Sequence, residues 1–146
     1  MSSSVAAGII AGIVLLLVFS IWSANRTAST AATGAEKSVV VIIPKDSSML
    51  NNNFEPSVIK VVVGYNNTVV WINQDVVPHS VISDNGYTDP INGKFDSTLD
   101  ENHPFIGPNK QFAFTFTEKG EYHYHSEPHP WMRGTVIVMS QGSATN

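Results

Sequence analysis

Short segments rich in β-branched and aromatic residues constrain the fold of this 146-residue chain most strongly. Turn-forming residues such as Gly, Asn, Asp and Pro separate these segments, and none of the segments repeats its apolar residues with the period of a helix. Each is therefore predicted to be a strand. They cover residues 38–44, 58–63, 68–73, 79–83, 111–117, 121–125 and 135–140. Seven short strands are typical of an all-β, Greek-key β-sandwich.

Two details refine this prediction. Phe112, Phe114 and Phe116 occupy alternate positions of one segment, so one face of that strand is expected to carry aromatic bulk into the core. Gly64–Asn67 separates the second and third strands and is interpreted as a hairpin turn. The stretch 85–109 has no regular pattern, and so long an irregular segment is usually functional or mobile.

The N-terminus carries a separate signal. Val5 to Trp22 is uncharged and apolar or small throughout, and as a helix it would span about 27 Å, close to the thickness of a bilayer core. We expect an N-terminal transmembrane helix that anchors an exported domain, and a cleaved signal peptide is the alternative. The expected parts are an anchor or signal segment at 1–24, a flexible linker at 25–37, the β-sandwich at 38–141 and a tail at 142–146.

Charge and cysteine content exclude several classes of function. The chain has twelve Asp and Glu against eight Lys and Arg, a formal net charge of −4, which argues against a nucleic-acid partner. It contains no cysteine. No disulfide can stabilise the domain and no thiolate can bind a metal, so stability must come from packing.

Metal-ligating side chains occur in two separate segments. Ser126, His129 and Met132 follow one another at three-residue steps near the C-terminus, and Pro128 and Pro130 stiffen the loop between them. About fifty residues upstream, a strand ending in Trp71-Ile72-Asn73 is followed by His79. Two imidazoles and a thioether are ligands that suit copper.

These two segments resemble those of the cupredoxin family, the type 1 copper proteins of the plastocyanin and amicyanin kind. The resemblance implies a single copper ion held by His79, His129 and Met132, and a role in electron transfer. It places Ser126 where the family has its cysteine ligand. A neutral hydroxyl is a weaker copper ligand than a thiolate, so we expect a weakened site without blue colour, with Ser126 a weak ligand or none.

The same resemblance gives roles to neighbouring residues. Ser80 and Asn73 are expected to orient the ligands by hydrogen bonding, although Ser80 is equally well read as an ordinary strand serine. Pro130 and Trp131 are expected to form a docking patch beside His129, or simply to cap the sandwich.

A second histidine pair raises a further alternative. His123 and His125 alternate with Tyr122 and Tyr124, so the two imidazoles are predicted to point away from the first site. They form a candidate second metal site. The competing interpretation, which we favour, is a pair of ordinary polar strand residues.

Together these features predict a membrane-anchored copper-binding protein on the extracytoplasmic side, either periplasmic or at the cell surface. Its expected partner is a small redox protein or a membrane oxidoreductase. One alternative is a protein that holds copper or delivers it to an accepting protein without fast redox turnover. Another is a metal-free interaction module. A copper enzyme is not expected, because such enzymes need further histidine clusters and a second domain of this kind.

Overall fold

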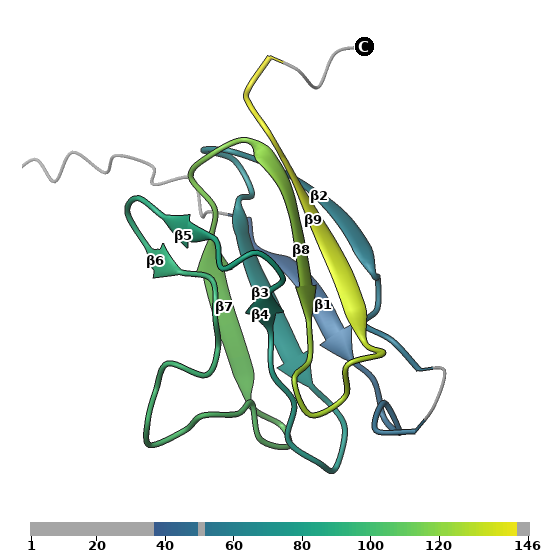
Figure 1. Ribbon diagram of the computed structural model, residues 1–146. Coiled ribbons are helices and arrows are strands. Elements are labelled where there is room, and N and C mark those ends of the chain that lie inside the picture. The colour runs from purple at the N-terminus through teal and green to yellow at the C-terminus, as the bar shows by residue number, and fades with distance from the viewer. Residues whose placement is uncertain (1–36, 50–51, 143–146) are drawn as a thin grey trace, which may run out of the picture. The chain divides into compact units, whose positions relative to one another are not determined.

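The computed structural model describes residues 37–49 and 52–142, and within them it contains nine strands and no helix (Figure 1). One sheet has the order β1-β3-β7 and the other the order β2-β9-β8-β4. The first sheet comprises β1 (Val39–Ile43), β3 (Thr68–Asn73) and β7 (Gln111–Thr115). The second comprises β2 (Val58–Val62), β9 (Arg133–Met139), β8 (Gly120–His125) and β4 (Ile82–Ser83). The all-β prediction is confirmed.

The pairing of strands contradicts one expectation. Gly64–Asn67 is not a hairpin turn, because the strands on either side of it belong to different sheets. β2 pairs in parallel with β9, whereas β3 pairs in parallel with β1 and antiparallel with β7. The turn therefore carries the chain from one layer of the sandwich to the other. A turn sequence specifies a change of direction, and the side chains of the flanking strands decide which partner each strand takes.

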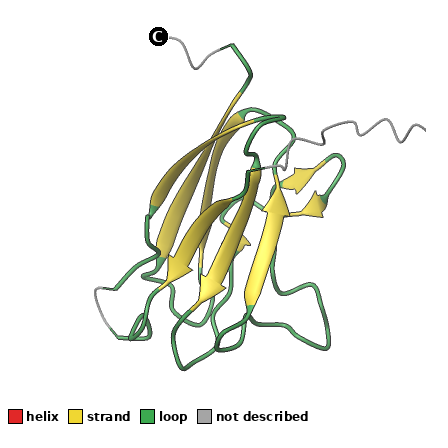
Figure 2. Ribbon diagram, turned by 180° about the vertical axis from the view of Figure 1, so that it is seen from behind, coloured by secondary structure: helices red, strands yellow, loops and turns green. Residues whose placement is uncertain are grey.

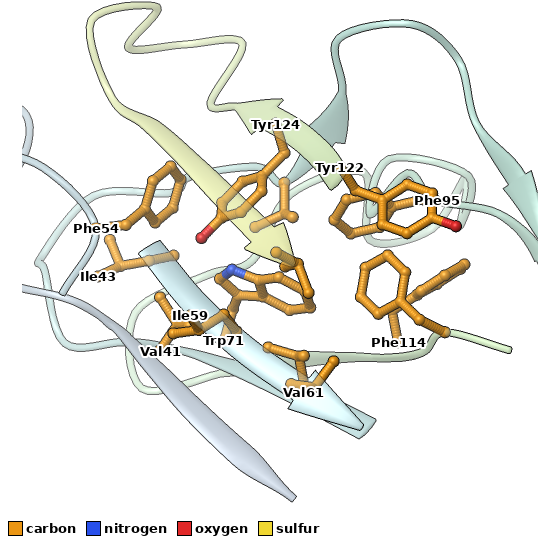
Figure 3. Packing of buried hydrophobic residues seen from close by; sticks show 14 of the residues in the cluster. Val41, Ile43, Phe54, Ile59, Val61, Trp71, Phe95, Phe114, Tyr122 and Tyr124 are labelled. Atoms are coloured by element: carbon orange, nitrogen blue, oxygen red, sulfur yellow. The ribbon is translucent and has the colours of Figure 1, made fainter. Parts of the chain in front are cut away.

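The core lies between the two sheets and is strongly aromatic (Figure 3). Trp71 from β3 meets Tyr124 from β8 edge-on, with ring centroids 5.4 Å apart, and both side chains are fully buried. Phe54 packs against the same tyrosine at 4.9 Å. Phe114 and Phe116 are also buried, as their alternation predicted, and Phe112 is partly buried against the same core. Aromatic pairs of this kind contribute about 0.5–1.5 kcal/mol each beyond the area that they bury.

Three strands end at the same pole of the sandwich, the lower end in Figure 1. β1 and β3 run in parallel, and the loops that follow them leave this pole beside the loop that follows β8 (Figures 1 and 2). Residues predicted to bind metal lie in the loops after β3 and β8. The sandwich therefore brings together segments that are about fifty residues apart in the sequence.

The first part of the irregular stretch 85–109 is held by a buried carboxylate. It forms a small ribbon of β5 (Thr88–Asp89) and β6 (Gly93–Lys94). Asp89 is 1% exposed and accepts hydrogen bonds from the backbone N–H of Thr117 (2.8 Å) and from those of Ile91 and Asn92 (both 3.0 Å). Burial alone would raise the pKa of the Asp89 carboxyl, but these hydrogen bonds outweigh it and lower the pKa from 3.8 to about 2.

Asp89 should therefore make folding stability depend on pH in acid. Because its pKa is lower in the folded chain, its contribution of roughly 2 kcal/mol is complete above pH 4 and is lost as the pH falls toward 2. In urea unfolding at a series of pH values, Asp89→Asn should be less stable than the unmodified chain at pH 7, and the difference should shrink toward pH 2. A difference that stays constant over this range would contradict the assignment.

The part of the chain that the structure describes contains no helix long and apolar enough to cross a membrane. The predicted anchor at 1–24 and nearly all of the linker lie outside the described residues.

Candidate metal centre

A rigid loop after β3 holds His79. Asn73, the last residue of the strand, is buried, and its side-chain amide donates to the carbonyl oxygens of Val77 and Ile106, each at 2.8 Å. Its amide oxygen accepts the N–H of Asp75. The backbones of His79 and Ile106 pair as an isolated bridge, with N···O distances of 3.1 and 2.8 Å. These bonds fix where the fully buried His79 ring lies.

The loop after β8 closes on itself. The N–H of His129 donates to the carbonyl of Ser126 (3.2 Å), and the N–H of Met132 donates to the carbonyl of His129 (2.9 Å). The N–H of Ser126 in turn donates to the carbonyl of Met132 (3.2 Å). Two successive turns therefore hold the backbones of these three residues in one closed loop, and their three-residue spacing matches the turns.

The two loops bring the rings of His79 and His129 into contact, tilted relative to one another. Their ring centroids are 4.5 Å apart, with 38° between the ring planes. The Nδ1 atom of each ring is buried and has no hydrogen-bond partner among the described residues. A buried ring nitrogen left without a partner is rare and needs an explanation, such as an ion that it binds. Met132 and Ser126 are fully buried as well.

Two serine hydroxyls join the loops. The backbone N–H of Ser80 donates to Oγ of Ser126 at 3.2 Å, and the N–H of Glu127 donates to Oγ of Ser80 at 2.8 Å. This reciprocal pair lies beside both histidines and fixes the distance between their loops. The hydroxyl of Ser126 is therefore already used as an acceptor within the protein.

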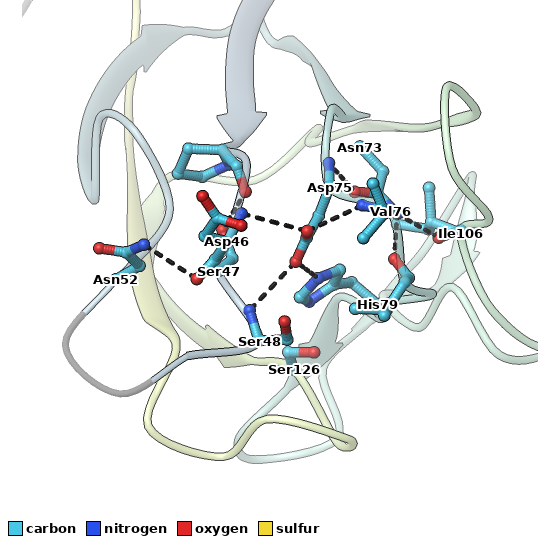
Figure 4. Close-up of polar contacts among 12 residues, drawn as sticks. Asp46, Ser47, Ser48, Asn52, Asn73, Asp75, Val76, His79, Ile106 and Ser126 are labelled. Atoms are coloured by element: carbon cyan, nitrogen blue, oxygen red, sulfur yellow. Dashed lines mark hydrogen bonds and ion pairs between the residues drawn. The ribbon is translucent and has the colours of Figure 1, made fainter.

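Sequence reasoning missed Asp75. Its carboxylate is 2% exposed and lies 2.9 Å from Nε2 of His79, on the ring edge opposite the unpartnered Nδ1 (Figure 4). Burial would raise the pKa of Asp75, but hydrogen bonds from His79 and from the backbone N–H groups of Val76, Ser48 and Asp46 lower it from 3.8 to about 2. The only signal in the sequence was an acidic residue four positions before the histidine.

His129 lies closer to solvent than His79, which is fully buried. Burial and the electrostatic effect of the nearby His79 lower the pKa of His129, and the carboxylate of Asp75 opposes this only in part. A neutral imidazole with a free lone pair is the form that binds a metal ion.

The donors at this centre fit copper. Two imidazoles, a thioether and a hydroxyl lie on the two joined loops, and nitrogen with soft sulfur is a ligand set that favours copper over magnesium or calcium. A zinc site would more commonly include cysteine, a third histidine or a carboxylate in direct contact. The structure thus brings the rings of His79 and His129 into contact and places Met132 and Ser126, both buried, in the closed loop that carries His129.

The remaining predicted residues lie nearby or apart. Trp131 is 39% exposed, contacts the ring of His129 at 5.3 Å, and donates from Nε1 to the carbonyl of Ser47 (3.3 Å). Pro130 is exposed beside it. Trp131 therefore lies next to His129 and is partly exposed to solvent.

His123 and His125 lie on the outer face of β8, opposite the buried Tyr122 and Tyr124. His123 contacts Thr135 and Glu121, and Nδ1 of His125 pairs with Asp84. No group of three or more His, Asp or Glu residues suited to a metal ion gathers anywhere within residues 37–49 and 52–142.

Comparison with known proteins places the chain in a family. The profile described as "Copper binding proteins, plastocyanin/azurin family" matches residues 39–139. Amicyanin of Paracoccus denitrificans is 35% identical over 108 residues, which are 74% of this chain and 70% of the relative. Amicyanin of Paracoccus versutus is 37% identical over 73 residues, about half the length of each chain.

Solved structures agree with this assignment. The purple cupredoxin of Nitrosopumilus maritimus is 30% identical, with a TM-score of 0.54 over 68% of this chain and 98% of its own. An amicyanin variant in its Cu(I) form is 32% identical, with a TM-score of 0.51 over 73% of this chain and 87% of its own. With a family profile that matches from the first strand to the last, and a relative that is 35% identical over 74% of this chain, the chain belongs to the plastocyanin/azurin family of copper-binding proteins, the cupredoxins.

Proposed function

We propose that this protein binds one copper ion through Nδ1 of His79, Nδ1 of His129 and the thioether of Met132, and that it carries electrons. The observation that supports this most directly is the pair of buried Nδ1 atoms without partners, on rings whose centroids are 4.5 Å apart. Structural histidines of a core are expected to use their buried ring nitrogens in hydrogen bonds, and two adjacent rings that both fail to do so point to a bound ion. The relatives named amicyanin and cupredoxin support the same role.

The chain's own groups prepare this centre. The bonds of Asn73 and the bridge to Ile106 fix His79, and the closed loop fixes His129 and Met132. Full burial of Met132 and His79 keeps water from one side of the centre. Copper supplies the exchange of one electron when it is bound, and rigid ligands reduce the movement that accompanies that exchange.

Ser126 raises a second candidate function, a protein that holds or delivers copper without fast redox turnover. Its hydroxyl already accepts the N–H of Ser80, and it is a weaker donor to copper than the thiolate that the resemblance places there. Two imidazoles and a thioether form a sufficient ligand set for Cu(I), whereas Cu(II) binds more strongly when an oxygen donor is added. Ligand sets that differ between oxidation states slow electron transfer.

The proposed location rests on the N-terminal sequence alone. We propose that the apolar run Val5–Trp22 holds the copper domain on the extracytoplasmic side of a membrane. Its partner is then a small redox protein or a membrane oxidoreductase that meets the exposed edge of His129 next to Trp131. In the alternative function, the partner is a protein that accepts copper. Neither role involves turnover of a substrate.

Copper titration tests the proposed centre. We expect one equivalent of Cu(I) to bind to the unmodified chain, as measured by competition with a chromophoric chelator. His79→Ala and His129→Ala should each weaken binding by at least tenfold, because each removes one of three ligands. His123→Ala is the matched control and should bind as the unmodified chain does.

Two outcomes would count against the proposal. Absence of copper binding would favour a metal-free interaction module, and equal losses in the His79 and His123 variants would place copper elsewhere. Voltammetry then separates the two copper functions. An electron-transfer protein should give a reversible voltammetric wave and fast electron self-exchange. A protein that only holds or delivers copper should bind Cu(I) but exchange electrons slowly.

A further inference from the structure

The carboxylate of Asp75 connects His79 with the loop that follows β1 through hydrogen bonds. Its Oδ1 atom accepts the backbone N–H groups of Asp46 (3.1 Å) and Val76 (2.8 Å). Its Oδ2 atom accepts the N–H of Ser48 (3.0 Å) and contacts Nε2 of His79 (2.9 Å), as the dashed lines in Figure 4 show. Both partners of the ion pair are buried, with side-chain exposures of 0% for His79 and 1% for Asp75.

This geometry decides which ring nitrogen of His79 carries the proton. Three of the four groups at the carboxylate are backbone N–H donors, and such bonds favour the ionised form of Asp75, which can only accept. The group at Nε2 must therefore be the donor. Nδ1 then keeps its lone pair, in agreement with its lack of a partner among the described residues.

The carboxylate also brings a negative charge close to a centre that has few charges. None of the side chains proposed to form it (His79, His129, Met132 and Ser126) is an anion, and a cysteine ligand would have supplied one. A buried charge next to a ligand acts strongly because water does not screen it. It stabilises Cu(II), which carries two positive charges, more than Cu(I), which carries one.

We propose that Asp75 is a positioning residue that holds His79 as the Nε2–H tautomer, with Nδ1 facing the metal, and that its carboxylate supplies part of the negative charge that a thiolate would otherwise bring. The first half of this inference concerns the metal-free protein. The second half rests on the proposed copper site. The same carboxylate orders the backbone at Asp46 and Ser48, next to the carbonyl that Trp131 contacts.

The first test uses the unmodified chain without metal. Nitrogen-15 NMR of the histidine rings at neutral pH should show His79 with a protonated Nε2 and a bare Nδ1. Because the Nε2 proton is buried and bonded, it should exchange slowly with solvent. A His79 ring protonated at Nδ1 would overturn the proposal, and this result does not depend on whether any variant folds.

The second test compares affinities for the two oxidation states. Asp75→Asn should weaken Cu(II) binding by about 10–100-fold and Cu(I) binding by clearly less, since it removes both the charge and the support of the ligand. Each tenfold difference between the two losses raises the midpoint potential by about 59 mV. Asp75→Glu keeps the charge and should restore most of the Cu(II) affinity, the tautomer and the potential.

Asp89→Asn is the matched control for the second test. It removes an equally buried, hydrogen-bonded carboxylate that contacts none of the copper ligands, so it should lower stability and leave the ratio of Cu(II) to Cu(I) affinity unchanged. If Asp75→Asn lost the same factor of affinity for Cu(I) and Cu(II), and the His79 tautomer did not change, Asp75 would have only a structural role. Failure of the unmodified chain to bind copper would instead count against the proposed function and leave the tautomer result standing.

Discussion

Ser126→Cys is expected to turn a nearly colourless Cu(II) protein into an intensely coloured one with a small copper hyperfine splitting. The substitution places a thiolate among His79, His129 and Met132, and a thiolate donates charge strongly to Cu(II). The site accepts the change because Ser126 is fully buried in a loop held by backbone bonds, and the two side chains differ by one atom. The cost in stability should remain below about 1.5 kcal/mol.

Absorption and electron paramagnetic resonance spectra with one equivalent of Cu(II) measure this effect. Ser57→Cys adds a cysteine at a partly exposed position next to β2 and should stay colourless. A colourless Ser126→Cys protein that binds copper would show that position 126 does not face the metal. Intense colour in the unmodified chain would show that the missing thiolate does not matter.

Gly134→Ala is expected to destabilise the domain by about 3 kcal/mol, at the upper end of the range for overpacked cores. Gly134 in β9 lies directly opposite Tyr124 in β8, and the tyrosine ring covers it. A Cβ atom at Gly134 would lie 2.2 Å from Cζ and 2.3 Å from Oη of that ring. The ring cannot turn aside, because it is fully buried between Phe54 and Trp71.

Thermal and urea unfolding test this prediction, and a loss of about 3 kcal/mol corresponds to a fall in Tm of more than about 10 °C in a domain of this size. Gly107→Ala is the control, since its Cβ would meet only the side chain of Lys110 at 3.7 Å and the stability should change by less than about 0.5 kcal/mol. A Gly134→Ala protein as stable as this control would show that the Tyr124 ring relaxes without cost. Because Tyr124 precedes Ser126 by two residues, the variant should also weaken copper binding.

The features that could be predicted from the sequence are those encoded by local pattern. Alternating apolar residues predicted the strands, since successive side chains of a strand point to opposite faces, and Phe114 and Phe116 are buried accordingly. The spacing of Ser126, His129 and Met132 reflects two turns closed by hydrogen bonds between neighbours in the chain. A resemblance built on these residues and on His79 was enough to predict the family.

Features that depend on contacts between distant segments could not be predicted. The sequence of Gly64–Asn67 fits a hairpin as well as a crossing between sheets, and the parallel pairing of β2 with β9 decides between them. Gly134 is unremarkable in the sequence, and only the ring of Tyr124 from the neighbouring strand makes it necessary. Asp75 resembled any other acidic loop residue.

The sequence by itself thus determined which elements form and which side chains are available to a metal, because strand period, turn residues and ligand chemistry are properties of short segments. The tertiary structure alone decided that the rings of His79 and His129 meet with free Nδ1 atoms, and that Asp75 lies behind one of them. The physical reason is that a buried carboxylate is tolerated only where several donors converge on it. Those donors come from the loop after β1 and the loop after β3, which only the folded sandwich brings together.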